Sequence, residues 1–131
     1  MENASRILIV DDIPQNIKVL GGLLRKEGYE IEVALSGKEA LEWVSEKPFD
    51  LILLDIMMPE MDGFEVCKSL KTMPEISKIP VIFLTAKYDS DSVIKGFNAG
   101  AVDYLTKPFA SEELMMRVKT HLTLRQRNQE L

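Results

Sequence analysis

The stretch at residues 7–12 reads Ile-Leu-Ile-Val-Asp-Asp, which is four large apolar residues followed by two carboxylates. Apolar runs of similar length recur at residues 51–54, 81–84 and, more weakly, 101–105. Short continuous runs rich in Ile, Val and Leu are typical of strands that are buried on both faces of a sheet. Residues 29–35 instead alternate between apolar and charged side chains, which predicts an edge strand with one wet face.

Helical patterns separate these predicted strands. They run from Pro14 to Glu27, from Ser36, from Asp62, from about Asp89 to Ala99, and from Ser111 onward. Proline suits a first helical turn, Gly28 and Gly100 are stop signals, and Ser36 with Glu39 predicts a capping box. Strand and helix therefore alternate five times, which predicts an α/β fold with a doubly wound, five-stranded parallel sheet and helices on both faces.

The composition is that of one soluble domain. A length of 131 residues fits about one domain, and 46% hydrophobic with 28% charged residues is ordinary for a globular protein. The net charge of -5 argues against nucleic-acid binding, and no apolar stretch approaches the roughly 18 residues of a membrane span. The single Cys67 and single His121 exclude an internal disulfide and a two-histidine metal site, so any metal would be held by oxygen. We therefore expect a cytoplasmic protein that contacts neither nucleic acid nor membrane.

Polar side chains follow every buried strand. They are Asp11 and Asp12, then Asp55, then Thr85, then Lys107. The carboxyl ends of parallel strands open on one edge of a sheet, where such folds bind their ligands. Three carboxylates close together repel one another unless a cation such as Mg²⁺ lies between them. With Lys107 as a second positive charge, the cluster predicts a site for a phosphoryl group, and Asp55 is the natural nucleophile.

Four motifs give the sequence a resemblance to the receiver domain of bacterial two-component response regulators over about residues 5–122. They are Leu-Ile-Val-Asp-Asp at 8–12, Asp-Ile-Met-Met-Pro-Glu-Met-Asp-Gly at 55–63, Leu-Thr-Ala at 84–86 and Tyr-Leu-Thr-Lys-Pro-Phe at 104–109. The resemblance implies a flavodoxin-like sheet with strand order 2-1-3-4-5 and five helices on its two faces. It also implies a switch that accepts a phosphoryl group from a phosphohistidine of a sensor histidine kinase or a phosphotransfer protein.

The resemblance further implies how the metal and the acceptor are arranged. Asp55 would be the phosphoacceptor. Asp12 and Asp55 would bind Mg²⁺ directly, the backbone carbonyl of Met57 would be a third protein ligand, and Asp11 would act through water. Mn²⁺ is a possible substitute for Mg²⁺.

The remaining roles implied by the resemblance concern the phosphoryl group itself. Lys107 and Thr85 would each contact a phosphoryl oxygen, and the backbone amides of Met57 and Ala86 would complete the cradle. Tyr104 would turn inward when Thr85 moves.

Two further features follow from the same resemblance. The Lys107–Pro108 peptide bond would be cis. Met57 and Lys87 would lie at the rim and tune the lifetime of the phosphoryl group.

Two other kinds of function stay open at this point. A Mg²⁺-dependent phosphohydrolase that works through an aspartyl phosphate would use the same carboxylates, but the Asp-x-Asp pairing typical of such enzymes is absent at residues 55–57 and no sizeable cap is evident. A flavin or nucleotide binder would need a glycine-rich phosphate loop, and the seven glycines form no such pattern. We therefore expect a signalling module with only self-phosphorylation and self-dephosphorylation chemistry, not an enzyme.

The end of the chain suggests a second element of organisation. We expect residues 1–122 to form the receiver domain and residues 123–131 to extend the last helix, where Leu124, Asn128 and Leu131 have coiled-coil spacing. This predicts a natural chain that continues past Leu131 into a signalling helix and an output domain, although a stand-alone adaptor is the other possibility. A homodimer would form through the fourth helix, fifth strand and fifth helix, or through the last helix.

Overall fold

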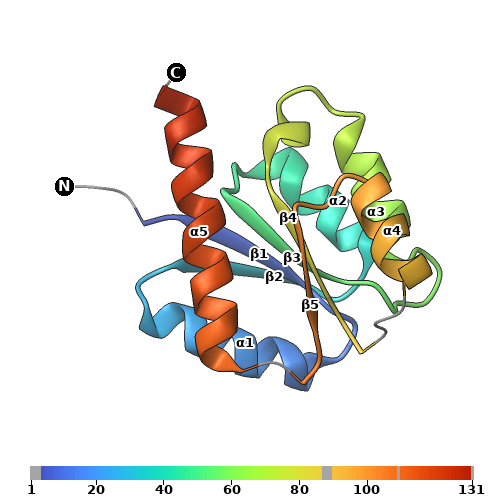
Figure 1. Cartoon of the computed structure of the whole chain (residues 1–131), viewed down its shortest axis with the longest axis horizontal. Coiled ribbons are helices and arrows are strands. Elements are labelled where there is room, and N and C mark those ends of the chain that lie inside the picture. Colours follow the sequence, from blue (N-terminus) through green and yellow to red (C-terminus); the bar gives the residue numbers. More distant parts are fainter. Residues whose placement is uncertain (1–3, 87–89, 109, 131) are drawn as a thin grey trace.

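The computed structural model describes residues 4–86, 90–108 and 110–130. Its strands are β1 (Arg6–Val10), β2 (Glu30–Ala34), β3 (Leu51–Asp55), β4 (Val81–Thr85) and β5 (Asp103–Thr106). Its helices are α1 (Pro14–Lys26), α2 (Gly37–Glu46), α3 (Gly63–Lys71), α4 (Ser90–Asn98) and α5 (Ser111–Glu130), with a short 3-10 turn η1 at Ile76–Lys78. Figure 1 shows the strands enclosed between two groups of helices.

The five strands form one parallel sheet in the order β2-β1-β3-β4-β5. This confirms the predicted fold, including β2 at an edge. Two boundaries differ from the prediction: β2 is confined to Glu30–Ala34, and β5 begins at Asp103 and not at residue 101. In the register, Val10 lies beside Leu54, and Asp55 lies beside Leu84, so the carboxyl ends of the central strands are level.

The continuous apolar runs are explained by burial on both faces of the sheet. In β1, Ile7 and Ile9 pack with residues of α1 and α5, whereas Leu8 and Val10 pack with residues of α2 and α3. In Figure 1 the helices α2, α3 and α4 gather on one side of the strands, and α1 and α5 lie on the other. Alternate residues of a strand therefore reach two separate apolar layers, and every position needs an apolar side chain.

Local signals set the ends of the helices largely as predicted. Pro14 is the first residue of α1, and Gly28 and Gly100 have φ of 90° and 111°, a conformation that glycine adopts at no steric cost. Ser36 accepts a hydrogen bond from the Glu39 amide, but the return bond of the predicted capping box is absent among the described residues. The pattern at Asp62 and Glu65 predicts the same motif for α3, and there the capping box is complete.

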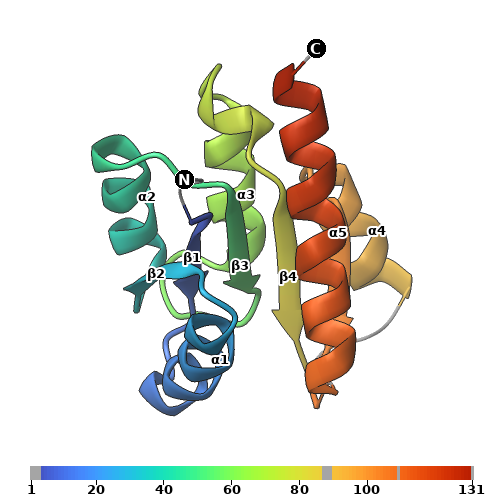
Figure 2. The ribbon, with the colours of Figure 1, turned by 90° about the vertical axis from the view of Figure 1, so that its left-hand side faces the viewer.

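The last helix is longer than the sheet needs and is held along its length. Figure 2 shows α5 spanning the height of the molecule. Near its end, a guanidinium NH of Arg125 donates to the Lys78 carbonyl at 3.1 Å, and Nε lies 3.7 Å from a carboxylate oxygen of Asp50. Within the described ranges, no helix combines the length and apolar character needed to cross a bilayer.

An ion cluster joins β5 to the middle of α5. Both carboxylate oxygens of Asp103 lie 3.0 Å from one Arg117 nitrogen, and Oδ2 lies 2.9 Å from Nε2 of His121. Burial raises the pKa of Asp103, but the hydrogen bonds from His121, the Tyr104 amide and Arg117 together lower it below its ordinary value. The ionised form of Asp103 therefore stabilises the fold.

We expect Asp103→Asn to lower the free energy of unfolding at pH 7 by about 1–2 kcal/mol. Because the pKa of Asp103 is lower in the folded than in the unfolded chain, this contribution is present above the unfolded value of 3.8 and is lost as the pH falls through the folded value. Urea unfolding at pH 7 and at acid pH measures the difference. Glu42→Gln, at an exposed position of α2, is the control and should leave stability nearly unchanged. An equal loss for both variants would contradict the prediction.

Candidate functional site

The sheet brings the predicted polar residues to one edge. Asp11 directly follows β1, Asp55 ends β3, Thr85 ends β4, and Lys107 directly follows β5. One carboxylate oxygen from each of Asp11, Asp12 and Asp55 lies within 4.8 Å of the other two. Asp11, Asp55 and Thr85 are buried, with exposed fractions of 1%, 4% and 0%. Asp12 is half-buried, and a cluster of three carboxylates of which two are buried is rare in proteins without a compensating cation.

Lys107 supplies one positive charge to the cluster. Its Nζ lies 3.1 Å from Oδ2 of Asp11 and 3.5 Å from Oδ2 of Asp55. Its backbone amide donates to the Thr85 carbonyl at 2.7 Å, which fixes the chain where β5 ends. The Lys107–Pro108 peptide bond is cis. The ammonium is therefore shared by two carboxylates and stands closer to Asp11.

Asp55 is poorly stabilised as an anion. Burial and the neighbouring Asp11 charge raise the pKa of Asp55 to about 6, against the lowering effects of Lys107 and of the Met57 amide, which donates to Oδ1 at 3.2 Å. One ammonium therefore does not balance the negative charge of the cluster.

The donor set fits a small hard cation. Oδ1 of Asp12 is buried and has no hydrogen-bond partner among the described residues, so a polar atom of the cluster lacks a partner within the protein. Buried polar atoms normally have partners, and carboxylate oxygens are the ligands that Mg²⁺ prefers. The residues present therefore fit the divalent ion that the sequence predicts.

The other predicted residues lie around this cluster in different ways. The side chain of Met57 is 58% exposed, and Ala86 follows β4 at an exposed position. Tyr104 is only 8% exposed, and its ring packs edge-to-face on Phe83 at 6.3 Å, so it points inward in this structure. Lys87 lies outside the described residues.

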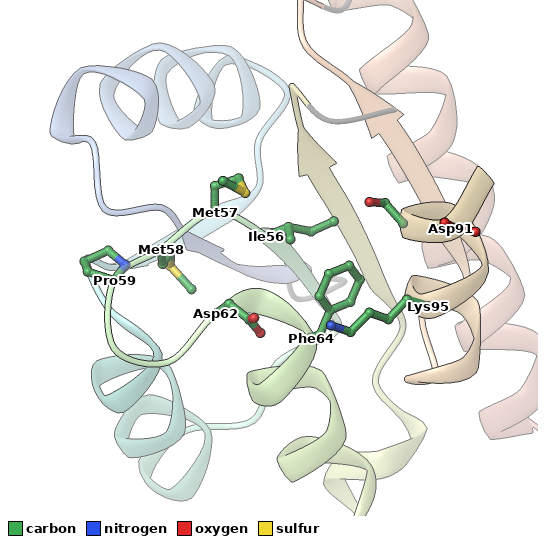
Figure 3. A pocket seen from close by; sticks show the side chains of 9 residues that line it. Ile56, Met57, Met58, Pro59, Asp62, Phe64, Asp91 and Lys95 are labelled. Carbon is green, nitrogen blue, oxygen red and sulfur yellow. The ribbon is translucent and has the colours of Figure 1, made fainter. Parts of the chain in front are cut away.

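A cavity of about 580 Å³ lies beside the cluster, between the loop after β3 and α4. Figure 3 shows Lys95 reaching from α4 across Phe64, and its Nζ is 4.6 Å from the ring centroid. Met57 lines this cavity, whereas its backbone amide contacts Asp55. The cavity contains none of the three clustered carboxylates.

The sequence reasoning missed one polar residue of the site. Asn16, in the first turn of α1, donates through Nδ2 to Oδ2 of Asp11 at 3.1 Å. The available signal was its position five residues after Asp11, just inside a helix that begins at Pro14. Only the path of the loop between β1 and α1 makes the contact possible.

Comparisons with known proteins agree with this geometry. The family model described as "Response regulator receiver domain" matches residues 7–119. A probable cyclic di-GMP phosphodiesterase of Vibrio cholerae is 49% identical over 93% of this chain and 28% of its own length. The DNA-binding response regulator MtrA of Mycolicibacterium smegmatis is 44% identical over 89% of this chain and 50% of its own length. This chain thus spans half or less of each of these two relatives.

A solved structure is also closely similar. It is the receiver domain of a sensor histidine kinase from Pseudomonas aeruginosa PAO1, with a magnesium ion coordinated in its active-site cleft. The TM-score is 0.86 at 29% sequence identity, over 92% of this chain and 99% of that one.

Proposed function

The chain belongs to the response regulator receiver domain family, whose members are phosphorylation-activated switches of two-component signalling, and we propose that its phosphoryl acceptor is Asp55. The observation that carries this proposal is the position of the Asp55 carboxylate, buried between two other carboxylates and within 3.5 Å of the Lys107 ammonium. A carboxylate oxygen attacks the phosphorus of a phosphohistidine, a P–O bond forms, and the P–N bond breaks with its electron pair returning to the imidazole.

Asp12, Asp55 and the Met57 carbonyl would hold Mg²⁺ directly, with Asp11 acting through water, and Mn²⁺ would substitute. The ion would neutralise charge on the acceptor and on the phosphoryl oxygens. The unpartnered Oδ1 of Asp12 supports this assignment.

Lys107 would pair with one phosphoryl oxygen and Thr85 would donate its hydroxyl to another, with the amides of Met57 and Ala86 completing the cradle. A phosphoryl group adds about two negative charges and three acceptor oxygens. Two or three charge-assisted hydrogen bonds of about 1.5–3 kcal/mol each are of the order needed to reverse a two-state population.

Tyr104 lies on the strand that leads to Lys107. Its ring would move together with Thr85 and so change the surface formed with α4 and α5. Met57 and Lys87 would tune the lifetime of the phosphoryl group.

We assign residues 1–122 to the receiver unit and residues 123–131 to a helix that leads toward an output domain, in a cytoplasmic protein. The greater lengths of the two curated relatives support this. The phosphoryl donor would be a sensor histidine kinase or a phosphotransfer protein. Exposed Ile94, Phe97 and Val102, at 57%, 47% and 42%, support a homodimer through α4, β5 and α5.

Incubation of the purified chain with acetyl phosphate tests the proposal. We expect one phosphoryl group per chain in the presence of Mg²⁺, seen as a shift on a phosphate-affinity gel, and almost none with EDTA, because the carboxylate cluster repels an anionic donor. Repeated rapid turnover of a small phosphate ester would instead favour the phosphohydrolase, and labelling that is equal with EDTA would contradict the role of the metal.

A further inference from the structure

Asp11 receives more hydrogen bonds than either of its carboxylate neighbours. Its Oδ1 accepts from the Ile13 amide at 2.9 Å. Its Oδ2 accepts both from Nδ2 of Asn16 and from Nζ of Lys107, each at 3.1 Å. Asn16 is half-buried and belongs to α1, whereas Lys107 follows β5, so two distant segments meet at one oxygen.

The two donors on Oδ2 affect each other. A carboxylate that already accepts a hydrogen bond has less negative charge to offer to an ammonium, and the amide of Asn16 therefore weakens the attraction between Asp11 and Lys107. This matters because Lys107 stands closer to Asp11 than to Asp55, at 3.1 Å against 3.5 Å. A phosphoryl group on Asp55 would compete with Oδ2 of Asp11 for the ammonium.

We infer that Asn16 is a positioning residue that eases the transfer of Lys107 from Asp11 to a phosphoryl group on Asp55. The inference rests on the proposed function of Asp55. When the ammonium leaves, the Asn16 amide remains on Oδ2, so the buried Asp11 keeps a donor on each oxygen and is spared the cost of an unsatisfied lone pair. Without Asn16 that cost returns, and Lys107 stays on Asp11.

Asn16 should act in opposite directions on the metal and on the phosphoryl group. Its amide withdraws negative charge from the carboxylates, so its removal should leave the affinity for Mg²⁺ unchanged or make it up to about threefold tighter. The same removal should weaken binding of beryllofluoride, a phosphoryl mimic, by about 3–10-fold at saturating Mg²⁺, because Lys107 is harder to recruit. A general disturbance of the site would weaken both ligands together.

The experiment compares Asn16→Ala with the wild-type chain by calorimetric titration, first with Mg²⁺ alone and then with beryllofluoride. Gln15→Ala is the matched control, since Gln15 is the exposed neighbour on the same turn of α1, and it should titrate like wild type. Asn16→Asp keeps the shape of the side chain and suits the first turn of a helix, so it should fold. It should bind Mg²⁺ more tightly, and beryllofluoride more weakly, than Asn16→Ala.

Unchanged or tighter binding of Mg²⁺ together with weaker binding of beryllofluoride would support the inference. Wild-type affinities for both ligands in Asn16→Ala, or a parallel loss of both, would overturn it. The proposed function fails separately, if the wild-type chain itself takes up neither beryllofluoride nor a phosphoryl group.

Discussion

Asp55→Asn should reduce labelling by acetyl phosphate by several orders of magnitude, to the background of the assay. The amide has almost the shape of the carboxylate, so the fold and the neighbouring side chains stay in place. It lacks the anionic oxygen that attacks phosphorus, and the neighbouring Asp11 carboxylate is already engaged by the Ile13 amide, Asn16 and Lys107. Phosphate-affinity electrophoresis and intact-mass spectrometry, both at saturating Mg²⁺, measure the loss.

Asp91→Asn is the control for this experiment. Asp91 lies on α4, is exposed and lines the adjacent cavity, but it is outside the carboxylate cluster. Its substitution should leave labelling unchanged. Persistent labelling of Asp55→Asn at the wild-type rate would show that the acceptor is another residue.

Asp55→Asn should also stabilise the metal-free protein. Burial and the charge of Asp11 raise the pKa of Asp55 to about 6 from 3.8, so the ionised form costs free energy in the folded state. With EDTA at pH 7 we expect Asp55→Asn to raise the free energy of unfolding by about 1–3 kcal/mol. The cost is fully present above pH 6, shrinks as the pH falls from 6 to 3.8, and is gone below 3.8, where Asp55 is protonated in both states, so the two proteins should converge in acid. A variant less stable than wild type at pH 7 would contradict this.

Gly63→Ala should lower the free energy of unfolding by about 2–4 kcal/mol. A Cβ at this position would lie 2.5 Å from the carbonyl oxygen of Asp55 and 2.8 Å from Cα of Ile56, both of which are backbone atoms that no rotamer change can move. The Gly63 amide also donates to the Ile56 carbonyl at 2.9 Å. The start of α3 would have to move away from the end of β3, the strand that carries Asp55.

Gly22→Ala provides a control with the opposite sign. Gly22 lies inside α1, and a Cβ there meets nothing within 4 Å, so alanine should stabilise the protein by about 0.5–1 kcal/mol. Urea unfolding of both variants with EDTA measures the difference. A Gly63→Ala protein as stable as wild type would mean that the contact between α3 and β3 is not tight.

The strands and the carboxylate cluster could be predicted because both depend on short-range patterns. Apolar runs such as residues 7–10 identify strands buried on both faces, and parallel strands place their carboxyl ends together whatever the details of packing. The prediction of Asp55 beside Asp11, Asp12 and Lys107 needed only the order of strands and helices. The misplaced start of β5 and the incomplete capping box at Ser36 concern single hydrogen bonds at element ends, which sequence patterns define poorly.

Other properties depend on contacts between distant segments. The pKa of Asp55 is raised mainly by burial and by the charge of Asp11, which follows another strand, and neither is visible in the residues around position 55. The contact of Asn16 with Asp11 depends on the path of one loop, and the need for glycine at position 63 depends on how closely α3 approaches β3. The sequence by itself therefore determined which side chains meet at the edge of the sheet. Only the tertiary structure decided how charge and hydrogen bonds are shared among them, because electrostatic and steric energies change over distances of about an ångström that periodicity does not define.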